Sequence, residues 1–304
     1  MVQVILGSGG SIGDLLAKEL KAHTKNVRLV SRTPVQVNPD DELFKADLLH
    51  GPSVERAIEG AEVVYLTVGL KYSLKLWKKQ WPLVIDNVIR ACIKHNSKLV
   101  FFDNVYMYSK DAVPHMTEES ERNAPSEKGR VRQEVEKKIL DAMGSKGLKA
   151  LIARSADFYG PKSKNGILNI LVLDPLMRGK KMRWQNDKSK VHSFTLTTDA
   201  ARAVALLGNT DSAFGEVWHL PTSNERWTGN DFISNAAELS RKPAKYVLLS
   251  TLLMRVGGLF NQSVAELVEM QYQNTQDYFF DSSKFCEKFD FKPTPYLEGL
   301  KSCM

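Results

Sequence analysis

Short apolar runs alternate with helical patterns along the first two thirds of the chain. Nearly continuous apolar runs, without the polar alternation of a half-buried strand, indicate parallel strands that are buried on both faces. These runs are 2–6, 27–30, 63–68, 99–102 and 150–154. Apolar residues recur at helical spacing within 12–20, 52–58, 74–95 and 126–143. The alternation of strands and helices predicts an α/β fold built on a parallel sheet, with a smaller α+β lobe towards the C-terminus.

The first apolar run ends in a glycine-rich turn, Gly7-Ser8-Gly9-Gly10-Ser11-Ile12-Gly13, directly before a helical pattern. Gly7 permits a tight turn, Gly10 lets a pyrophosphate lie against bare backbone, and Gly13 lets the helix pack close to its strand. An ordinary strand–helix connection is the alternative. The strand at 27–30 closes a strand–helix–strand unit, however, and this context predicts a Rossmann-type, doubly wound sheet that binds a dinucleotide through residues 7–13.

The Gly-x-x-Gly-x-x-Gly spacing resembles the extended or atypical short-chain dehydrogenase/reductase family, in particular its NAD-dependent epimerase/dehydratase group. Arg154 and the later Tyr159-Gly160-Pro161 are similar to the family's Arg-x-x-x-x-Tyr-Gly-Pro turn. The resemblance extends over essentially the whole chain. It implies a nucleotide-binding domain over 1–165, to which 192–220 returns, and a smaller substrate-binding lobe over 166–304.

The residues after the second strand favour NADP over NAD, although NAD binding is not excluded. An NAD-preferring domain usually places an acid here to accept from the ribose hydroxyls, whereas this chain has Ser31 and Arg32. A guanidinium fork suits a 2′-phosphate. An exposed loop arginine is the alternative.

Other cofactor contacts are implied by the family resemblance. Asp47 and Leu48 match the pair that lines the adenine pocket, although Asp47 is equally suited to begin a turn. Val68 and Gly69 end the strand along which the cofactor passes. Asp157 and Phe158 lie in the turn that usually faces the nicotinamide and the substrate.

The catalytic pattern of the family is replaced. Active members use a Ser or Thr after the fifth strand and a Tyr-x-x-x-Lys pair. Here Asn104 matches the hydroxyl position, Lys128 the tyrosine and Arg132 the lysine. A lysine desolvated beside Arg132 and a nicotinamide would act as acid or base, whereas a solvated lysine at a helix start is the alternative. Asn104 would position a carbonyl, and Tyr106 is the alternative proton donor.

The substrate positions also depart from the family pattern. His192 stands where sugar epimerases carry the arginine that grips a diphosphate, and Asp157 stands at an asparagine. We therefore expect a smaller carbonyl or hydroxyl compound rather than a nucleotide sugar. Two function classes remain, namely an NADP(H)-dependent oxidoreductase or epimerase-like enzyme with a rebuilt acid/base site, and a regulatory protein that senses NADP(H) without catalysis.

The composition of the chain bears on its binding partners, its location and its need for a metal. The net charge is +7, and the scattered basic residues give little support to nucleic-acid or membrane binding. Three widely spaced cysteines fit neither a disulfide framework nor a zinc site, so we expect a reducing, cytoplasmic location and no metal. The two long helical patterns, 74–95 and 126–143, would form a homodimer interface by resemblance or simply cover the sheet of a monomer.

Overall fold

The computed structural model describes residues 2–161 and 163–304, and it divides into two compact units. The first unit comprises Met1–Asn104, Val131–Arg154 and Ala200–Leu220. The second unit comprises Val105–Arg130, Ser155–Asp199 and Pro221–Met304. Each unit is described by itself.

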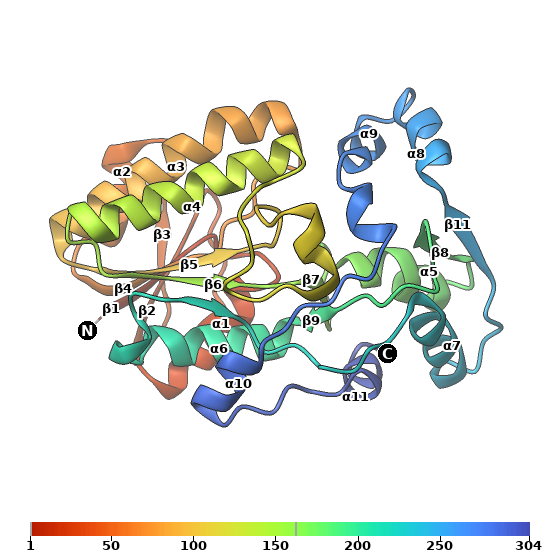
Figure 1. Ribbon diagram of the computed structural model, residues 1–304. Helices are drawn as coiled ribbons and strands as arrows, with labels where there is room; N and C mark the ends of the chain where they lie inside the picture. The colour runs from red at the N-terminus through yellow and green to blue at the C-terminus, as the bar shows by residue number, and fades with distance from the viewer. Residues whose placement is uncertain (1, 162) are drawn as a thin grey trace. The chain divides into compact units, whose positions relative to one another are not determined.

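The first unit is built on a seven-stranded sheet in which all strands run parallel, in the order β10-β6-β5-β4-β1-β2-β3 (Figure 1). Its strands are β1 (Val2–Leu6), β2 (Asn26–Ser31), β3 (Glu42–Lys45), β4 (Ala61–Leu66), β5 (Lys98–Asp103), β6 (Ala150–Arg154) and β10 (Val217–His219). The order reverses between β1 and β4, so the carboxyl ends of these strands form the crevice where open α/β sheets bind ligands.

Helices cover both faces of this sheet. One face carries α2 (Gly51–Ile58), α3 (Leu74–His95) and α4 (Glu127–Ser145), whereas α1 (Gly13–Glu19) and α6 (Thr197–Gly208) lie on the other (Figure 1). Short 3-10 turns lie at Leu20–Ala22 and Asp211–Ala213. The central strands are buried on both faces, as Val4, Ile5 and Leu6 show with no exposed surface. The predicted Rossmann-type, doubly wound parallel sheet is confirmed.

The second unit contains two small parallel sheets. One pairs β7 (Asp157–Tyr159) with β9 (Phe194–Leu196), and the other pairs β8 (Met182–Gln185) with β11 (Tyr246–Leu249). Its helices are α5 (Asp174–Met177), α7 (Gly229–Leu239), α8 (Thr251–Gly258), α9 (Gln262–Val268), α10 (Ser283–Phe289) and α11 (Tyr296–Ser302), with a π-helical turn at Asn169–Leu173 and 3-10 turns at Lys110–His115 and Gln271–Asn274.

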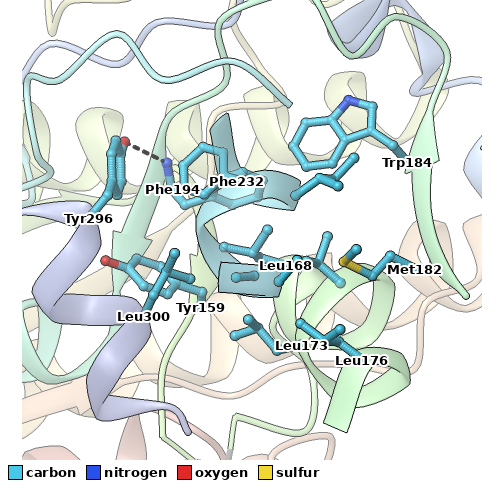
Figure 2. Packing of buried hydrophobic residues seen from close by; sticks show 14 of the residues in the cluster. Tyr159, Leu168, Leu173, Leu176, Met182, Trp184, Phe194, Phe232, Tyr296 and Leu300 are labelled. Carbon is cyan, nitrogen blue, oxygen red and sulfur yellow. Dashed lines mark hydrogen bonds between the residues drawn. The ribbon is translucent and has the colours of Figure 1, made fainter. Parts of the chain in front are cut away.

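An aromatic and aliphatic cluster forms the core of the second unit (Figure 2). Trp184 stacks on Phe232, and Tyr296 accepts a hydrogen bond on its hydroxyl oxygen from the backbone N–H of Phe194 at 3.1 Å. Gly229 and Gly299 allow the close packing, because a Cβ at either position would lie within 2.4 Å of a core side chain. Helices α7 and α11 are thereby fixed against the short strands.

The compact units have different ranges from the predicted functional domains. Residues 192–199 were expected to belong to the nucleotide-binding domain, but β9 pairs with β7 in the second unit. The segment Val105–Arg130 also falls in the second unit, so α4 begins in one unit and continues in the other. The assignment of cofactor to one domain and substrate to the other stays a prediction.

No helix in the described part of the chain has the length and apolar character needed to cross a bilayer. Cys92, Cys286 and Cys303 are all free thiols. Burial raises the pKa of Cys303 to about 11, and burial also raises the pKa of Cys286. These thiols are therefore poor nucleophiles at neutral pH.

Candidate functional site

The glycine-rich turn between β1 and α1 has the backbone geometry that its sequence predicts. Gly7 has a φ of +113°, and a Cβ there would lie 2.5 Å from the backbone nitrogen of Val68. A Cβ at Gly13 would lie 2.8 Å from the carbonyl oxygen of Gly7. Gly9, with a φ of +89°, faces open space, and Gly10, Ser11 and Ile12 complete the turn. The turn thus packs tightly on its protein side and stays open on the other.

Two serine hydroxyls at this edge of the sheet are buried without a hydrogen-bond partner among the described residues. They are Ser8 Oγ in the glycine-rich turn and Ser31 Oγ at the end of β2. Buried hydroxyls are normally hydrogen-bonded, so a ligand bound at this edge would supply the partners that these two hydroxyls lack. Arg32 follows Ser31 and is exposed, with no ion pair in the described part of the chain.

One carboxylate beside the glycine-rich turn would repel an anionic ligand. Asp14, in the first turn of α1, accepts a hydrogen bond from the backbone N–H of Gly9 at 2.7 Å. That N–H would otherwise be available to a phosphate oxygen. A bound pyrophosphate therefore has to displace the Asp14 carboxylate or bind beside it.

The remaining predicted cofactor residues lie on segments that follow β3 and β4. Asp47 begins a turn, because its carboxylate accepts from the backbone N–H of Leu49 at 3.0 Å, while Leu48 is buried. The turn-forming alternative for Asp47 is therefore present, and the adenine contact stays a prediction. Val68 is half-buried against the glycine-rich turn, and Gly69 is exposed.

Arg132 is buried in a network of charged side chains in the first unit. Its guanidinium donates to Asp103 Oδ1 through Nε, at 2.9 Å, and through Nη2, and it lies over the rings of Trp81 and Phe101 at 4.2 and 4.9 Å. Arg154, with no exposed surface, completes the network between Asp103 and Glu136. The planar guanidinium suits this stacked site in a way that an ammonium does not.

Lys128 lies one helical turn before Arg132 on α4, and its ammonium contacts acceptors from α9 and the residues after it. Only 1% of Lys128 is exposed. Its Nζ donates to Glu269 Oε1 at 2.7 Å and to the Glu266 carbonyl oxygen at 2.8 Å, and it pairs with the Glu266 carboxylate at 2.5 Å. The alternative interpretation of Lys128 as a solvated lysine at a helix start is therefore wrong, whereas its role as an acid or base stays a prediction. The ammonium has three donors, and these three acceptors can engage all of them.

Asn104 and Tyr106 follow the end of β5. The backbone N–H of Asn104 donates to Asp103 Oδ1 at 2.8 Å, which fixes the turn out of the strand. Tyr106 is half-buried, and its carbonyl oxygen lies so close to α4 that a Cβ at Gly129 would approach it to 2.3 Å. Gly129 therefore allows the segment around Tyr106 to contact the first turn of α4.

Asp157 and His192 form a pair in the second unit. His192 Nε2 lies 3.0 Å from Asp157 Oδ2, and the imidazole stacks on the ring of Tyr278 with centroids 4.3 Å apart. His192 is buried, whereas about a quarter of the Asp157 side chain is exposed, at 27%. Phe158 is half-buried beside it in β7. Burial, with a further contribution from Asp157, raises the pKa of the Tyr278 hydroxyl well above its ordinary value, so this phenol stays protonated.

Among the described residues, no group of three or more His, Cys, Asp or Glu side chains is arranged to hold a metal ion. The acidic residues near the predicted site have side-chain partners instead: Glu269 and Asp103 form ion pairs with Lys128 and Arg132, and Asp157 is hydrogen-bonded to His192.

The family model of the NAD dependent epimerase/dehydratase family matches residues 3–219. The chain belongs to this family. The replacement of the family's Tyr-x-x-x-Lys pair by Lys128 and Arg132 stays a prediction, and the structure shows that both cations are ion-paired. No curated protein is matched significantly by this sequence.

Solved structures with the same fold are found at low sequence identity. A UDP-glucuronic acid 4-epimerase from Bacillus cereus, in complex with UDP-glucuronic acid and NAD, has a TM-score of 0.82 at 18% identity, covering 99% of this chain and 97% of its own. A dTDP-glucose 4,6-dehydratase from Streptomyces venezuelae with NAD bound has a TM-score of 0.80 at 14% identity, with 99% and 95% covered. A UDP-glucose 4-epimerase from Thermus thermophilus in complex with NAD has a TM-score of 0.78 at 18% identity, with 99% and 97% covered.

Sequence reasoning missed the partners of the two α4 cations. Asp103 ends a buried strand, and an acid there indicates a buried counter-charge. Glu266 and Glu269 are spaced to lie on one face of a helix, although α9 itself ends at Val268. Their distance of more than 130 residues from Lys128 in sequence leaves no local signal of the contact.

Proposed function

We propose that this protein is an NADP(H)-dependent oxidoreductase or epimerase-like enzyme of its family, with an acid/base site that differs from Tyr-x-x-x-Lys. The observation that carries the proposal concerns the carboxyl ends of β1 and β2. The open glycine-rich turn follows β1, and the hydroxyls of Ser8 in this turn and of Ser31 at the end of β2 are buried without a partner among the described residues. The structural neighbours described with NAD support a nicotinamide dinucleotide at this place. When bound, that cofactor supplies a hydride donor or acceptor.

The preference for NADP over NAD rests on Ser31 and Arg32. No acid follows β2 to accept from the ribose hydroxyls, and the exposed Arg32 is available to a 2′-phosphate. Titration calorimetry with both cofactors tests this. Arg32→Ala should weaken NADP(H) binding by roughly 1.5 to 3 kcal/mol and leave NAD(H) binding unchanged, because one charge-assisted interaction is removed. Equal affinities of the wild-type protein for both cofactors would refute the preference.

The substrate we propose is a small carbonyl or hydroxyl compound. His192 is enclosed by Trp184 and Tyr278 and paired with Asp157, so it does not present a guanidinium-like fork to a diphosphate. Asp157 is the more exposed member of the pair and is the one we assign to substrate contact. Saturable turnover of a uridine-diphosphate sugar would overturn this assignment.

Proton transfer is assigned to the residues at the end of β5 and the start of α4. Asn104 would position the reacting carbonyl, Arg132 would contribute a fixed charge, and Lys128 or Tyr106 would move the proton. The three acceptors around Lys128 favour Tyr106 for this step. Tyr106→Phe should then abolish turnover with little change in cofactor affinity, whereas loss of turnover in a folded Lys128→Met/Glu266→Gln/Glu269→Gln variant would assign the step to the lysine.

A cofactor-sensing regulatory protein is the second candidate. It is favoured by one observation, namely that both cations at the catalytic positions are buried in ion pairs rather than left for chemistry. If no compound in a screen of carbonyls and alcohols is turned over while NADP(H) binds tightly, this candidate becomes the better one.

A homodimer through α3 and α4 is a further part of the proposal, as is a cytoplasmic location, which the three free cysteines support. Leu83, Ile93 and Leu140 on these helices expose more than a third of their surface. Arg90 and Lys138 line a groove between α3 and α4. Sedimentation of the wild-type chain against a Leu83→Glu/Leu140→Glu variant tests whether this face holds two copies together.

A further inference from the structure

The second unit carries an apolar face that no part of the described chain covers. It lies on α8 and on the turn that follows, and we refer to its five residues as the α8 apolar face. Their exposed fractions are 71% for Leu252, 50% for Leu253, 50% for Val256, 81% for Leu259 and 87% for Phe260. Large apolar side chains grouped in this way usually mark an interaction site.

Helix α8 has two sides with different environments. Gly258 packs against α9, where an added Cβ would lie 3.0 Å from the Cα of Ala265, and Met254 is 4% exposed. Leu252, Val256 and Leu259 follow at intervals of four and three residues, which places them on one side of the helix. The buried side fixes the helical hairpin to its unit, and the other side presents leucine, valine and phenylalanine to the solvent.

Cationic residues border this face without acidic neighbours in the sequence. Arg255 is exposed on α8 itself, three residues after Leu252. From Arg241 to Ala265 the chain contains no Asp or Glu. The stretch 241–265 contains four basic residues, Arg241, Lys242, Lys245 and Arg255, so the segment that carries the apolar face has a net positive charge.

We propose that the α8 apolar face inserts into the surface of a membrane that contains anionic lipids. An amphipathic element with apolar side chains on one side and Lys or Arg at its border binds in the plane of the lipid headgroups. Leu259 and Phe260 are more than 80% exposed at the end of α8, so both side chains are accessible for insertion between lipid headgroups. The scattered charge of the whole sequence gives little support to membrane binding, whereas the stretch 241–265, which carries the apolar face, has four cations and no acid.

Flotation of the full-length protein with vesicles tests this proposal. Vesicles of phosphatidylcholine with about one third phosphatidylglycerol should bind the wild-type protein at physiological salt, and pure phosphatidylcholine vesicles should bind it at least tenfold more weakly. Leu259→Asp/Phe260→Asp should reduce binding to the anionic vesicles at least tenfold. Arg255→Glu should reduce it several-fold, and high salt should reproduce the effect of Arg255→Glu.

Leu43→Asp is the matched control, since Leu43 is a similarly exposed leucine, at 44%, on β3 of the first unit and belongs neither to the α8 apolar face nor to the proposed α3–α4 interface. It should leave vesicle binding unchanged, and thermal unfolding should confirm that all variants are folded. Failure of the wild-type protein to bind anionic vesicles would overturn the proposal. It would also be overturned if the Leu259→Asp/Phe260→Asp variant bound as well as the wild type, or if sedimentation showed that the same substitutions dissolve a dimer of this chain.

Discussion

The glycine-rich turn after β1 and the first two turns of α4 both belong to the predicted site, but they differ in what they leave available to a ligand. In the turn, the function depends on backbone shape, and Gly7, Gly9 and Gly13 retain it. At the start of α4, the proposed function depends on side-chain chemistry, and the side chains there are Lys128 and Arg132. The turn still has orphaned polar atoms that fit a ligand, whereas both α4 cations already have partners within the chain.

A motif that is defined by backbone geometry and one that is defined by side-chain chemistry therefore support different conclusions about function. A position that only glycine can occupy indicates a backbone geometry that persists whether or not a ligand binds. The role of a charged side chain at a predicted catalytic position cannot be inferred until its neighbours are known, because an ion pair engages the hydrogen-bond donors that catalysis would need. The predictions that follow separate the two regions, from the largest expected effect to the smallest.

The largest effect is expected for Gly7→Ala. A Cβ at this position would overlap the backbone of Val68, and the φ of +113° is strained for any other residue. The overlap and the strain together should lower the free energy of unfolding by about 3 kcal/mol or more and abolish cofactor binding. Chemical denaturation and cofactor titration measure the two effects.

Gly9→Ala is the matched control for this substitution. Its φ of +89° is also strained, but no atom lies within 4 Å of the added Cβ. The loss of stability should therefore be smaller, about 1 kcal/mol. Equal losses for the two alanine variants would show that close packing on Val68 does not explain the glycine at position 7.

The next largest effect is expected for Lys128→Met. Removing the ammonium leaves the Glu266 and Glu269 carboxylates, whose side chains are 12% and 25% exposed, without their counter-charge. The free energy of unfolding should fall by about 2 to 4 kcal/mol. Adding Glu266→Gln and Glu269→Gln should restore much of it, because the uncompensated charges are then removed.

Lys137→Met gives the control on the same helix. Lys137 is 72% exposed and pairs with Asp141 on the surface of α4, so its loss should change stability by less than about 0.5 kcal/mol. The restored triple variant also separates stability from chemistry. If it folds well and turns over substrate, Lys128 is a structural cation and the proton donor lies elsewhere.

The contrast between local backbone signals and long-range side-chain contacts also explains which parts of the structure could be predicted from the sequence. Five strands of the parallel sheet, β1, β2, β4, β5 and β6, were predictable because they are nearly continuous apolar runs, and their bounds differ from the predicted ones by two residues or fewer, as in β4, which ends at Leu66. Strand β3 gives no such signal, because Glu42–Lys45 is short and largely exposed. The N-cap of α7 at Thr228 is equally local, with a capping box to Asp231. The surroundings of Lys128 and Arg132 were not predictable, since Asp103 and Glu269 come from distant parts of the chain.

A moderate effect in the opposite direction is expected for Asp14→Asn. The carboxylate now accepts from the Gly9 N–H at the place where an anionic phosphate would bind. Removing its charge should tighten NADP(H) binding several-fold, because repulsion of the phosphate is lost while a hydrogen-bond acceptor remains. Calorimetric titration measures the change. Weaker binding would indicate that Asp14 supports the bound state of the turn, and the turn would then not be a simple backbone site.

The smallest effect, and the most selective one, is expected for Ser31→Ala compared with Ser8→Ala. Neither hydroxyl has a partner in the described part of the chain, so both variants should leave the free energy of unfolding of the ligand-free protein unchanged or slightly higher. Ser31→Ala should weaken NADP(H) binding by about 1 kcal/mol and leave NAD(H) binding unaltered, since we assign its hydroxyl to the 2′-phosphate. Ser8→Ala should weaken both cofactors equally, because its hydroxyl lies in the turn that holds the pyrophosphate common to them. A loss of stability without any change in affinity would mean that these hydroxyls serve the fold, and the glycine-rich turn would then resemble the start of α4 in being used by the chain itself.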